Sequence, residues 1–215
     1  MSLPLPRVPV RALGALVLLG LLGGCQAIST LNDASRSLDS FDLAAAAVPP
    51  GPEARSRRVL LVALPTATGA VATDRIIVKP NPLQVAYLPD SRWIDPAPQH
   101  VQSLLIRSIG NSGGVGFVGG DAAGPVPDFV LLSDLQTFDA EIGPDGKPRQ
   151  VTVRLNLTLV RDFDRALVAS RRFEATVPLA STEPLSVAAA FNSAMAAILR
   201  DATRWTVAGM GGRVG

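Results

Sequence analysis

The second half of the chain alternates hydrophobic and polar residues, and this pattern predicts strands. In its clearest part, apolar residues occupy every second position, which is typical of a strand with one buried face. These residues are Val151, Val153, Leu155, Leu157 and Leu159. Strands are also expected at Phe129–Ala140 and Leu167–Val177, and tight turns at 143–146 and 162–165 separate the three segments. We therefore expect an antiparallel meander. The last strand should bury one face, formed by Leu167, Ala169, Phe173, Ala175 and Val177.

Three shorter strands are expected earlier in the chain. Val59–Leu64 is apolar throughout and stops at a proline, as in a strand that is buried on both faces. Arg75–Lys79 is rich in β-branched residues, and Leu83–Leu88 returns after the turn at Pro80-Asn81-Pro82. Residues 66–74 are expected to form a loop between the first two of these strands.

Two helices are predicted, each with one apolar stripe. The first begins with Asp95 as its N-cap and Pro96 in its first turn. Its stripe is Val101, Leu104, Leu105 and Ile109. The second begins near Thr182 and Pro184, and its stripe is Phe191, Met195, Ile198, Ala202 and Trp205. Strands, helix, strands and helix in this order predict an α+β two-layer sandwich, in which two helices pack on a mixed, mostly antiparallel sheet.

The first residues of the chain are typical of a secretory signal. Arg7 and Arg11 precede an uncharged apolar run, 12–22, that is too short to span a bilayer. The run ends in Leu-Gly-Gly followed by Cys25, which resembles the lipobox of bacterial lipoproteins. The resemblance implies cleavage before Cys25 and lipidation of its thiol. Cys25 is the only cysteine, so no disulfide can form within the chain.

The chain is therefore expected to have four parts. A signal peptide, 1–24, precedes the lipidated cysteine and a flexible tether, 25–57, which is rich in Ser, Asp, Ala and Pro. The α+β domain follows at 58–208, and 209–215 form a frayed tail. Gln26 stands where an acidic residue would retain a lipoprotein on the inner membrane in the sorting system that this signal resembles. We therefore expect the periplasmic face of the outer membrane.

The balance of charge gives no support for a nucleic-acid partner. The chain has 20 basic and 18 acidic side chains, and two arginines leave with the signal, so the mature chain has 18 of each. No basic residues cluster as they would on a nucleic-acid-binding face. No transmembrane helix is expected after the signal.

No catalytic or metal-binding set is recognisable. His100 is the only histidine, and it is expected on the surface of the first helix. Gly114, Gly116 and Gly119 match G-x-G-x-x-G, but a predicted helix precedes this motif where a dinucleotide site needs a strand, so that site is rejected. The G-x-S-x-G motif of serine hydrolases is absent. We expect no enzyme activity, no metal and no cofactor apart from the lipid on Cys25.

One cluster of residues could form a partner surface at the corner between a strand and the first helix. Aromatic, arginine and carboxylate side chains gather there, and such residues dominate the hot spots of protein interfaces. They are Tyr87, Asp90, Arg92, Trp93 and Asp95. A structural role is favoured, in which Trp93 fills the entrance of the helix and Arg92 pairs with Asp90 or Asp95.

Three parts of the chain together resemble the ABC-type transport auxiliary lipoproteins, the group that includes the PqiC lipoprotein. They are the lipobox at Cys25, the segment Ala86–Pro96, and Ala189–Ala194 leading to Arg204-Trp205. The resemblance covers about residues 59–207. It implies partnership with an MCE-domain protein and an ABC permease and ATPase, which move lipids or other hydrophobic molecules between two membranes. It also implies a ring-forming homo-oligomer that receives the MCE protein.

Three functional hypotheses follow. The first is a non-enzymatic docking lipoprotein of a lipid-transport system. The second is a lipoprotein that itself binds a hydrophobic ligand in a cavity. The third, and least favoured, is an envelope hydrolase that depends on His100.

Overall fold

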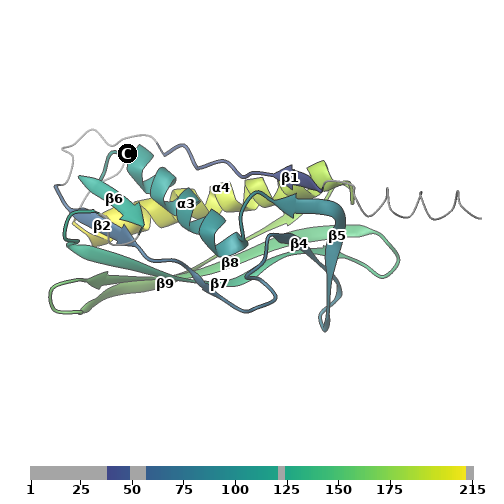
Figure 1. Cartoon of the computed structure of the whole chain (residues 1–215), viewed down its shortest axis with the longest axis horizontal. Helices are drawn as coiled ribbons and strands as arrows, with labels where there is room; N and C mark the ends of the chain where they lie inside the picture. The colour runs from purple at the N-terminus through teal and green to yellow at the C-terminus, as the bar shows by residue number, and fades with distance from the viewer. Residues whose placement is uncertain (1–37, 49–56, 121–123, 212–215) are drawn as a thin grey trace, which may run out of the picture. The chain divides into compact units, whose positions relative to one another are not determined.

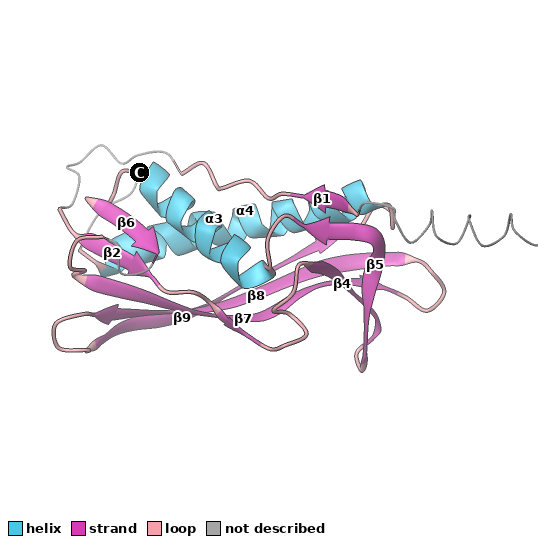
Figure 2. Ribbon diagram, viewed as in Figure 1, coloured by secondary structure: helices cyan, strands magenta, loops and turns pink. Residues whose placement is uncertain are grey.

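The computed structural model describes residues 38–48, 57–120 and 124–211. Within these ranges, two helices pack on one face of a nine-stranded sheet (Figures 1 and 2). The elements are β1 (Asp39–Phe41), β2 (Val59–Val62), β3 (Thr66–Ala67), β4 (Arg75–Asn81), β5 (Gln84–Trp93), α3 (Ala97–Asn111), β6 (Phe117–Gly120), β7 (Phe129–Ile142), β8 (Pro148–Arg161), β9 (Leu167–Pro178) and α4 (Pro184–Gly209). The predicted α+β sandwich is confirmed. We call the sheet face toward the helices the inner face and the opposite one the outer face.

The three long strands form the predicted meander. β7 and β8 pair in antiparallel fashion from Phe129↔Arg161 to Ile142↔Pro148, and β9 pairs along β8. All the alternating apolar residues of β8 lie on the inner face and are fully buried. In the turn between β7 and β8, Gly146 has a φ of +73°, a conformation that favours glycine.

One residue of β9 lies on the opposite face from the one predicted. A bulge separates the pairs Leu159↔Ala169 and Val160↔Leu167, so Leu167 no longer shares the face of Ala169. Its side chain is 66% exposed. Phe173, beyond the bulge, is buried on the inner face as expected.

β2, β3 and β4 follow one another along β7 and run parallel to it. Their partners advance along β7 from Phe129 to Glu141. β3 falls within 66–74, where only a loop was predicted. Leu60 and Val62 are fully buried, whereas the other two residues of β2 are partly exposed. The prediction that this strand is buried on both faces was wrong, because the helices cover the inner face alone.

Both helices bury their predicted stripes. All four residues of the α3 stripe are fully buried, and so are the first four of the α4 stripe. Trp205, the last residue of the α4 stripe, is partly exposed and packs edge-on against Phe173, with ring centroids 5.7 Å apart. The predicted N-caps, Asp95 and Thr182, were each wrong by one residue. Pro96 and Glu183 occupy the cap positions, and no side-chain hydrogen bond caps either helix.

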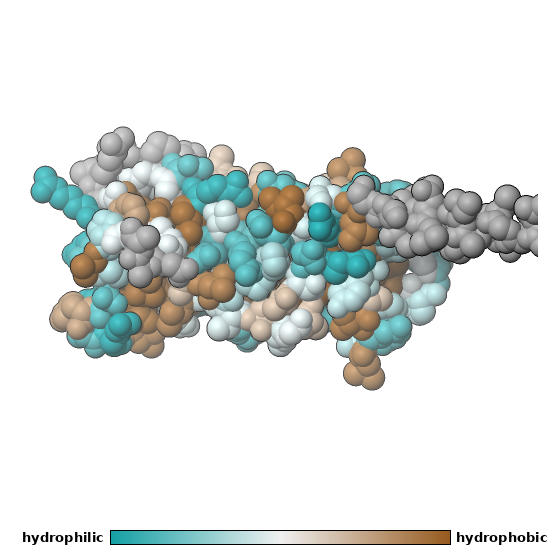
Figure 3. Space-filling view, in the orientation of Figure 1, coloured by the Kyte–Doolittle hydropathy of each residue, from teal (hydrophilic) through white to brown (hydrophobic). Residues whose placement is uncertain are grey.

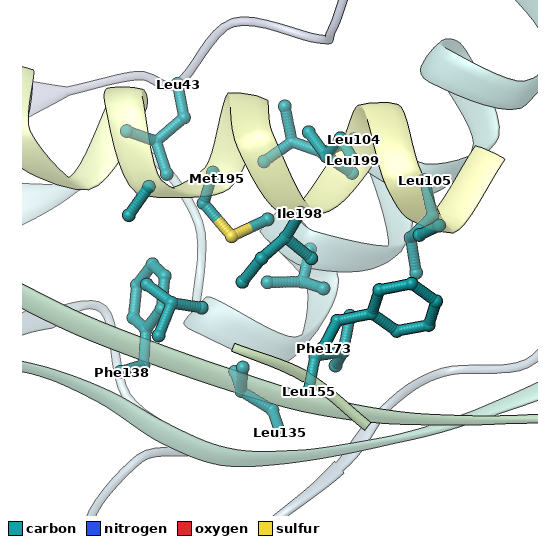
Figure 4. Packing of buried hydrophobic residues seen from close by; sticks show 14 of the residues in the cluster. Leu43, Leu104, Leu105, Leu135, Phe138, Leu155, Phe173, Met195, Ile198 and Leu199 are labelled. Atoms are coloured by element: carbon teal, nitrogen blue, oxygen red, sulfur yellow. The ribbon is translucent and has the colours of Figure 1, made fainter. Parts of the chain in front are cut away.

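The core lies between α4 and the meander. Figure 4 shows Met195 and Ile198 of α4 facing sheet residues that include Leu135, Phe138 and Leu155. These five side chains are fully or almost fully buried. Burying a side chain of this size contributes roughly 1.5–3 kcal/mol to stability. Hydrophobic burial therefore fixes α4 on the inner face.

Residues 39–48 pack on the rest of the domain, although a flexible tether was predicted over 25–57. β1 runs parallel to the end of β5. Leu43, Ala46 and Val48 belong to the core and are almost fully buried. The tether prediction therefore does not hold for 39–48, and the rest of it, at 25–37 and 49–56, lies outside the described residues.

Side chains of both helices hold the backbone of this segment. The N–H of Ala44 donates to Asn192 Oδ1 at 2.8 Å, and the N–H of Ala46 donates to Ser108 Oγ at 3.0 Å. Figure 1 shows the segment running along the helix layer after β1. Each helix therefore contributes at least one hydrogen bond to the strap formed by residues 39–48.

The last described turn of the chain is also ordered against the core. Met210 was predicted to belong to a frayed tail, 209–215, yet its side chain is almost fully buried and its N–H donates to the carbonyl of Thr206 at 3.1 Å. Residues 212–215 lie outside the described part. Among the described helices, none combines the length and the hydrophobicity that crossing a bilayer requires.

Candidate functional site

The corner predicted from the sequence is a bend in β5. Two successive pairs between β4 and β5 are Arg75↔Arg92 and Ile77↔Tyr87. Between these pairs β4 has one residue, whereas β5 has four, 88–91. Within this bulge, Asp90 has a φ of +50°, a left-handed conformation that aspartate tolerates better than most residues. The bend turns the end of β5 toward β1, with which it pairs (Figure 1).

Trp93 ends β5 and points into the core. Its side chain is 1% exposed, and its ring packs against Phe191 and Phe138 with centroid distances of 5.1 and 5.6 Å. Its backbone N–H donates to the carbonyl of Asp74 at 2.6 Å. Trp93 therefore belongs to the packing of the domain, as the structural interpretation expected, and does not belong to an exposed surface.

Arg92 points outward and has different partners from those predicted. Its Nε donates to Ser40 Oγ at 3.1 Å, and its Nη1 lies 4.0 Å from a carboxylate oxygen of Asp74. The expected pairing with Asp90 or Asp95 was wrong, because the parallel pairing of β1 with β5 places Ser40 opposite Arg92.

Tyr87 is exposed on the side of the bend nearer the hairpin turn. The Arg75 guanidinium lies 5.4 Å from the centre of its ring, a cation–π contact. The corner thus separates into a buried anchor, Trp93, and four exposed residues. Within the described part of the chain, no ion pair or hydrogen bond joins these four residues to one another.

His100 is buried, which corrects the prediction of a helix-surface histidine. Its side chain is 1% exposed, and its Nε2 lies 2.8 Å from Asp42 Oδ1. With the proton on Nε2, the ring donates to this carboxylate, which also accepts the N–H of Leu43 at 2.7 Å. A buried ring that bonds Asp42 is not placed to act on a substrate in solvent. His100 therefore holds the strap. No local sequence pattern could predict this contact, because Asp42 lies 58 positions earlier in the chain.

A polar cavity of about 450 Å³ lies between the β4–β5 hairpin and the outer face. In it, Arg154 donates from Nε and Nη2 to the two carboxylate oxygens of Glu174, both at 2.9 Å, and from Nη1 to Thr137 Oγ1 at 3.1 Å. Hydrogen bonding between the two side chains raises the pKa of Arg154 and lowers the pKa of Glu174. Beside them, Lys79 Nζ lies 2.9 Å from Asp139 Oδ2.

The charges around this polar cavity cancel. Three cationic residues line it, Lys79, Arg149 and Arg154, and so do three anionic ones, Asp139, Glu141 and Glu174. The lining includes threonines, but it has no histidine that could activate a threonine as a nucleophile. It also has no cysteine that could serve as the nucleophile itself. The cavity therefore favours neither a cationic nor an anionic ligand, and it lacks a catalytic set.

The opposite end of the outer face is apolar. Leu132, Phe163 and Leu167 are exposed there. A second cavity, of about 260 Å³, opens beside β2, and its lining includes Leu61 and Phe117. Figure 3 shows hydrophobic surface at the end of the domain where β2, β6 and the β8–β9 turn lie. Exposed apolar surface of this kind is typical of an interaction site.

The described residues contain no group of three or more His, Cys, Asp or Glu side chains that could hold a metal ion. The two residues predicted to direct anchoring and sorting, Cys25 and Gln26, lie outside the described ranges. What the described part offers is a set of surfaces and a firmly attached strap.

A family model described as the ABC-type transport auxiliary lipoprotein component matches residues 41–202. The chain belongs to this family. The predicted resemblance is confirmed, and the match runs from the end of β1 into α4. The family is described as an auxiliary lipoprotein component of ABC-type transport, and it is not a family of enzymes.

Two crystal structures and one further protein are similar to this chain. Protein XCC0632 from Xanthomonas campestris, of the DUF330 family model, has a crystal structure with a TM-score of 0.73 and 26% identity, and the match covers 80% of this chain and 97% of that one. A second crystal structure, of an uncharacterised protein, shares the fold with a TM-score of 0.59 and 15% identity, over 77% of this chain and 96% of that one. The uncharacterised protein bll6063 of Bradyrhizobium diazoefficiens is 32% identical over 168 residues, which are 73% of this chain. The match spans only 42% of that relative's length.

Proposed function

We propose that this protein is a non-enzymatic outer-membrane lipoprotein that docks an MCE-type ABC transport system, which moves lipids or other hydrophobic molecules between the inner and outer membranes. The family match over 41–202 carries the proposal. The arrangement of the domain supports it, because the one histidine is buried and four of the six charged side chains of the polar cavity pair with one another. The ATPase and the permease would be other chains.

The proposed anchor is a lipid on Cys25, and Gln26 would allow release to the outer membrane, with the domain on the periplasmic side. Acyl chains on one cysteine hold a protein stably only when there are two or more of them. Mass analysis of the protein from native envelopes would test this. A bare Cys25, or a chain that retains residues 1–24, would rule the anchor out.

The proposed partner is an MCE-domain protein. The test is co-purification of the lipidated protein with the MCE-domain protein in mild detergent. A Cys25→Ser variant is the matched control, because it lacks the anchor and cannot be retained through a shared membrane fragment. We expect both forms to retain the partner. Loss of the partner from both forms would contradict a docking role.

We also propose that the protein assembles as a homo-oligomer. β9 supports this, because it is twelve residues long and pairs only with β8 among the described strands. Edge strands of this length are usually protected or paired. Native mass spectrometry of the detergent-solubilised protein would show a mass that is a multiple of the single chain, and a monomer at all concentrations would exclude the assembly.

The alternative function is direct binding of a hydrophobic ligand. The apolar cavity beside β2 favours it, but its volume of about 260 Å³ is below the roughly 300–1,000 Å³ of most small-molecule sites. Native mass spectrometry of the Cys25→Ser variant distinguishes the two functions. We expect no co-purified lipid, and a stoichiometric lipid adduct would favour the alternative.

A further inference from the structure

The hairpin between β4 and β5 carries a hydrophobic side chain that its turn does not need. Leu83 is 97% exposed. The turn is closed by the pair Asn81↔Gln84, and the N–H of Leu83 donates to Asn81 Oδ1 at 3.1 Å. The hydrogen bond involves only the backbone of Leu83, so the turn does not depend on the leucine side chain. Glycine, asparagine, aspartate and serine are the residues usually favoured in such turns.

The outer part of this hairpin also lacks charge. Residues 80–89, which we call the arm, contain no Asp, Glu, Lys, Arg or His. The last pair between β4 and β7 is Lys79↔Glu141, so beyond it the arm is supported only by its own two strands. Figures 1 and 2 show the arm projecting on the outer-face side, and Figure 3 shows hydrophobic atoms at its tip. Val85, next to the turn, is also exposed.

An aromatic residue and a cation stand at the base of the arm. Tyr87 is exposed, and the guanidinium of Arg75 lies over its ring. Tyrosine and basic side chains are enriched at the level of lipid headgroups. Tyr87 is four residues from Leu83 along an extended strand, a distance of about 13 Å. This exceeds the roughly 5–8 Å depth of one headgroup layer, so Leu83 can reach hydrocarbon while Tyr87 remains among headgroups.

The length of the tether keeps the arm near a bilayer. Residues 25–38 separate the predicted lipid anchor from β1, and they can span at most about 50 Å. β1 pairs with the end of β5, the strand that forms one side of the arm. Burial of one leucine favours hydrocarbon by only about ten- to a hundred-fold. In a chain that is already anchored, the membrane is present at a high effective concentration near the arm. This small preference is then enough to set the orientation of the domain.

We propose that the arm is a second membrane contact, in which Leu83 inserts into the leaflet that holds the lipid on Cys25. The proposal rests on the anchor in the proposed function and adds an orientation, with the outer face toward the membrane and the helices away from it. A lipid surface fits this tip better than a protein partner does. Residues 80–86, the outer part of the arm, offer neither charge nor the tryptophan, tyrosine or arginine anchors on which protein interfaces depend.

A spin label at the tip tests the proposal in the full lipidated chain. Because the chain has one cysteine and the anchor consumes it, Leu83→Cys provides a unique thiol for a nitroxide. The labelled protein is placed in vesicles of phosphatidylethanolamine and phosphatidylglycerol. Accessibility to oxygen, which enters hydrocarbon, is compared with accessibility to a water-soluble nickel complex. The reference is the Cys25→Ser form with the same label, measured in solution without detergent or lipid. We expect the ratio of oxygen accessibility to nickel accessibility at position 83 to be several-fold higher in vesicles than in this reference.

Leu185→Cys is the matched control. Leu185 is also a highly exposed leucine, but it lies in the first turn of α4, in the layer on the other side of the sheet. We expect its label to remain accessible to nickel. A second pair of variants carries the label on Val85→Cys. One of the two also carries Leu83→Asp, and the other retains Leu83. Aspartate suits a turn, so the fold should persist, while the label at Val85 should change from shielded to water-exposed. Equal nickel accessibility at positions 83 and 185 would overturn the proposal.

The design separates this proposal from the proposed function. If Leu83→Asp abolishes co-purification with the MCE-domain protein, or if position 83 is shielded only after that protein is added, the arm is a protein contact and the membrane assignment is wrong. If position 83 is shielded by lipid while no form retains the MCE-domain protein, the arm contacts the membrane and the docking role fails. A bare Cys25 in the native protein would overturn both.

Discussion

His100 and Asp42 form a contact that joins the core of the domain to the strap near its start. The Nε2 of His100 lies 2.8 Å from Asp42 Oδ1, although the residues are 58 positions apart in the sequence. The imidazole is buried beside Trp93, with ring centroids 6.0 Å apart, whereas the carboxylate is half exposed. Any force on the proposed tether would therefore reach the core through the strap and would not act on a loose end.

Replacement of Asp42 tests this contact. In Asp42→Ala, the buried Nε2 of His100 loses its carboxylate partner, and we expect the free energy of unfolding to fall by about 1–3 kcal/mol in urea titrations. The amide protons of Ala44 and Ala46 should exchange faster with solvent, because the strap opens more often. Asp39→Ala removes an exposed carboxylate from the same segment and is the control. If both variants change stability equally, the contact has no special role.

Trp93 provides a test of whether the corner is core or interface. Trp93→Ala is expected to lower the free energy of unfolding by about 3–5 kcal/mol, because it removes a large side chain packed between Phe138 and Phe191. Trp93→Phe should cost less, since it retains an aromatic ring. Ile94→Ala, at the exposed neighbouring position, should have little effect. A Trp93→Ala protein of unchanged stability that no longer binds its partner would assign the corner to an interface instead.

Periodic patterns predicted most of the fold, because each apolar residue in them shares its environment with neighbours two, three or four positions away. The inner face of β8 and the stripe of α4 are of this kind. The strap has no such period. Leu43, Ala46 and Val48 stand among alanines, and their burial depends on helices far along the chain. The face of Leu167 depends on a bulge in β9, which only the pairing with β8 reveals.

The candidate site was predicted in part for the same reason. Residue types at the corner identified Trp93 as an anchor, since a tryptophan before a helix usually packs against it. The partners of Arg92 could not be predicted, because Ser40 and Asp74 reach it through strand pairing. Leu83 was predicted only as part of a strand. Its significance depends on where β4 leaves β7, and only the register shows that.

The left-handed backbone of Asp90 gives a prediction about the bend. A β-branched residue is strained at a φ of +50°, so Asp90→Val should lower the free energy of unfolding by about 1–2 kcal/mol. Asp90→Gly should be close to neutral, because glycine adopts this conformation freely. Thermal unfolding of the two variants measures the difference. Asp95→Val is the control, since Asp95 is exposed and does not have a positive φ. Equal losses in Asp90→Val and Asp95→Val would show that the backbone conformation is not the cause.

The pairing of Glu174 with Arg154 predicts a dependence of stability on pH. The hydrogen bonds donated by Arg154 lower the pKa of Glu174, and the charges of Arg154 and Arg172 act in the same direction. The folded chain therefore binds the proton of this carboxyl less tightly than the unfolded chain does. The resulting stabilisation is present above the pKa of the unfolded state, about 4.3, and is lost as the pH falls through the lower pKa of the folded state.

Glu174→Gln isolates this contribution. The difference in the free energy of unfolding between the native chain and the variant should be constant above about pH 5 and should shrink as the pH falls below 4. Urea titrations at a series of pH values provide the measurement. The same substitution in an Arg154→Gln background is the control, because the cause of the shift is then absent and the dependence on pH should largely disappear. If the dependence persists in that background, the acid sensitivity arises from groups other than this pair.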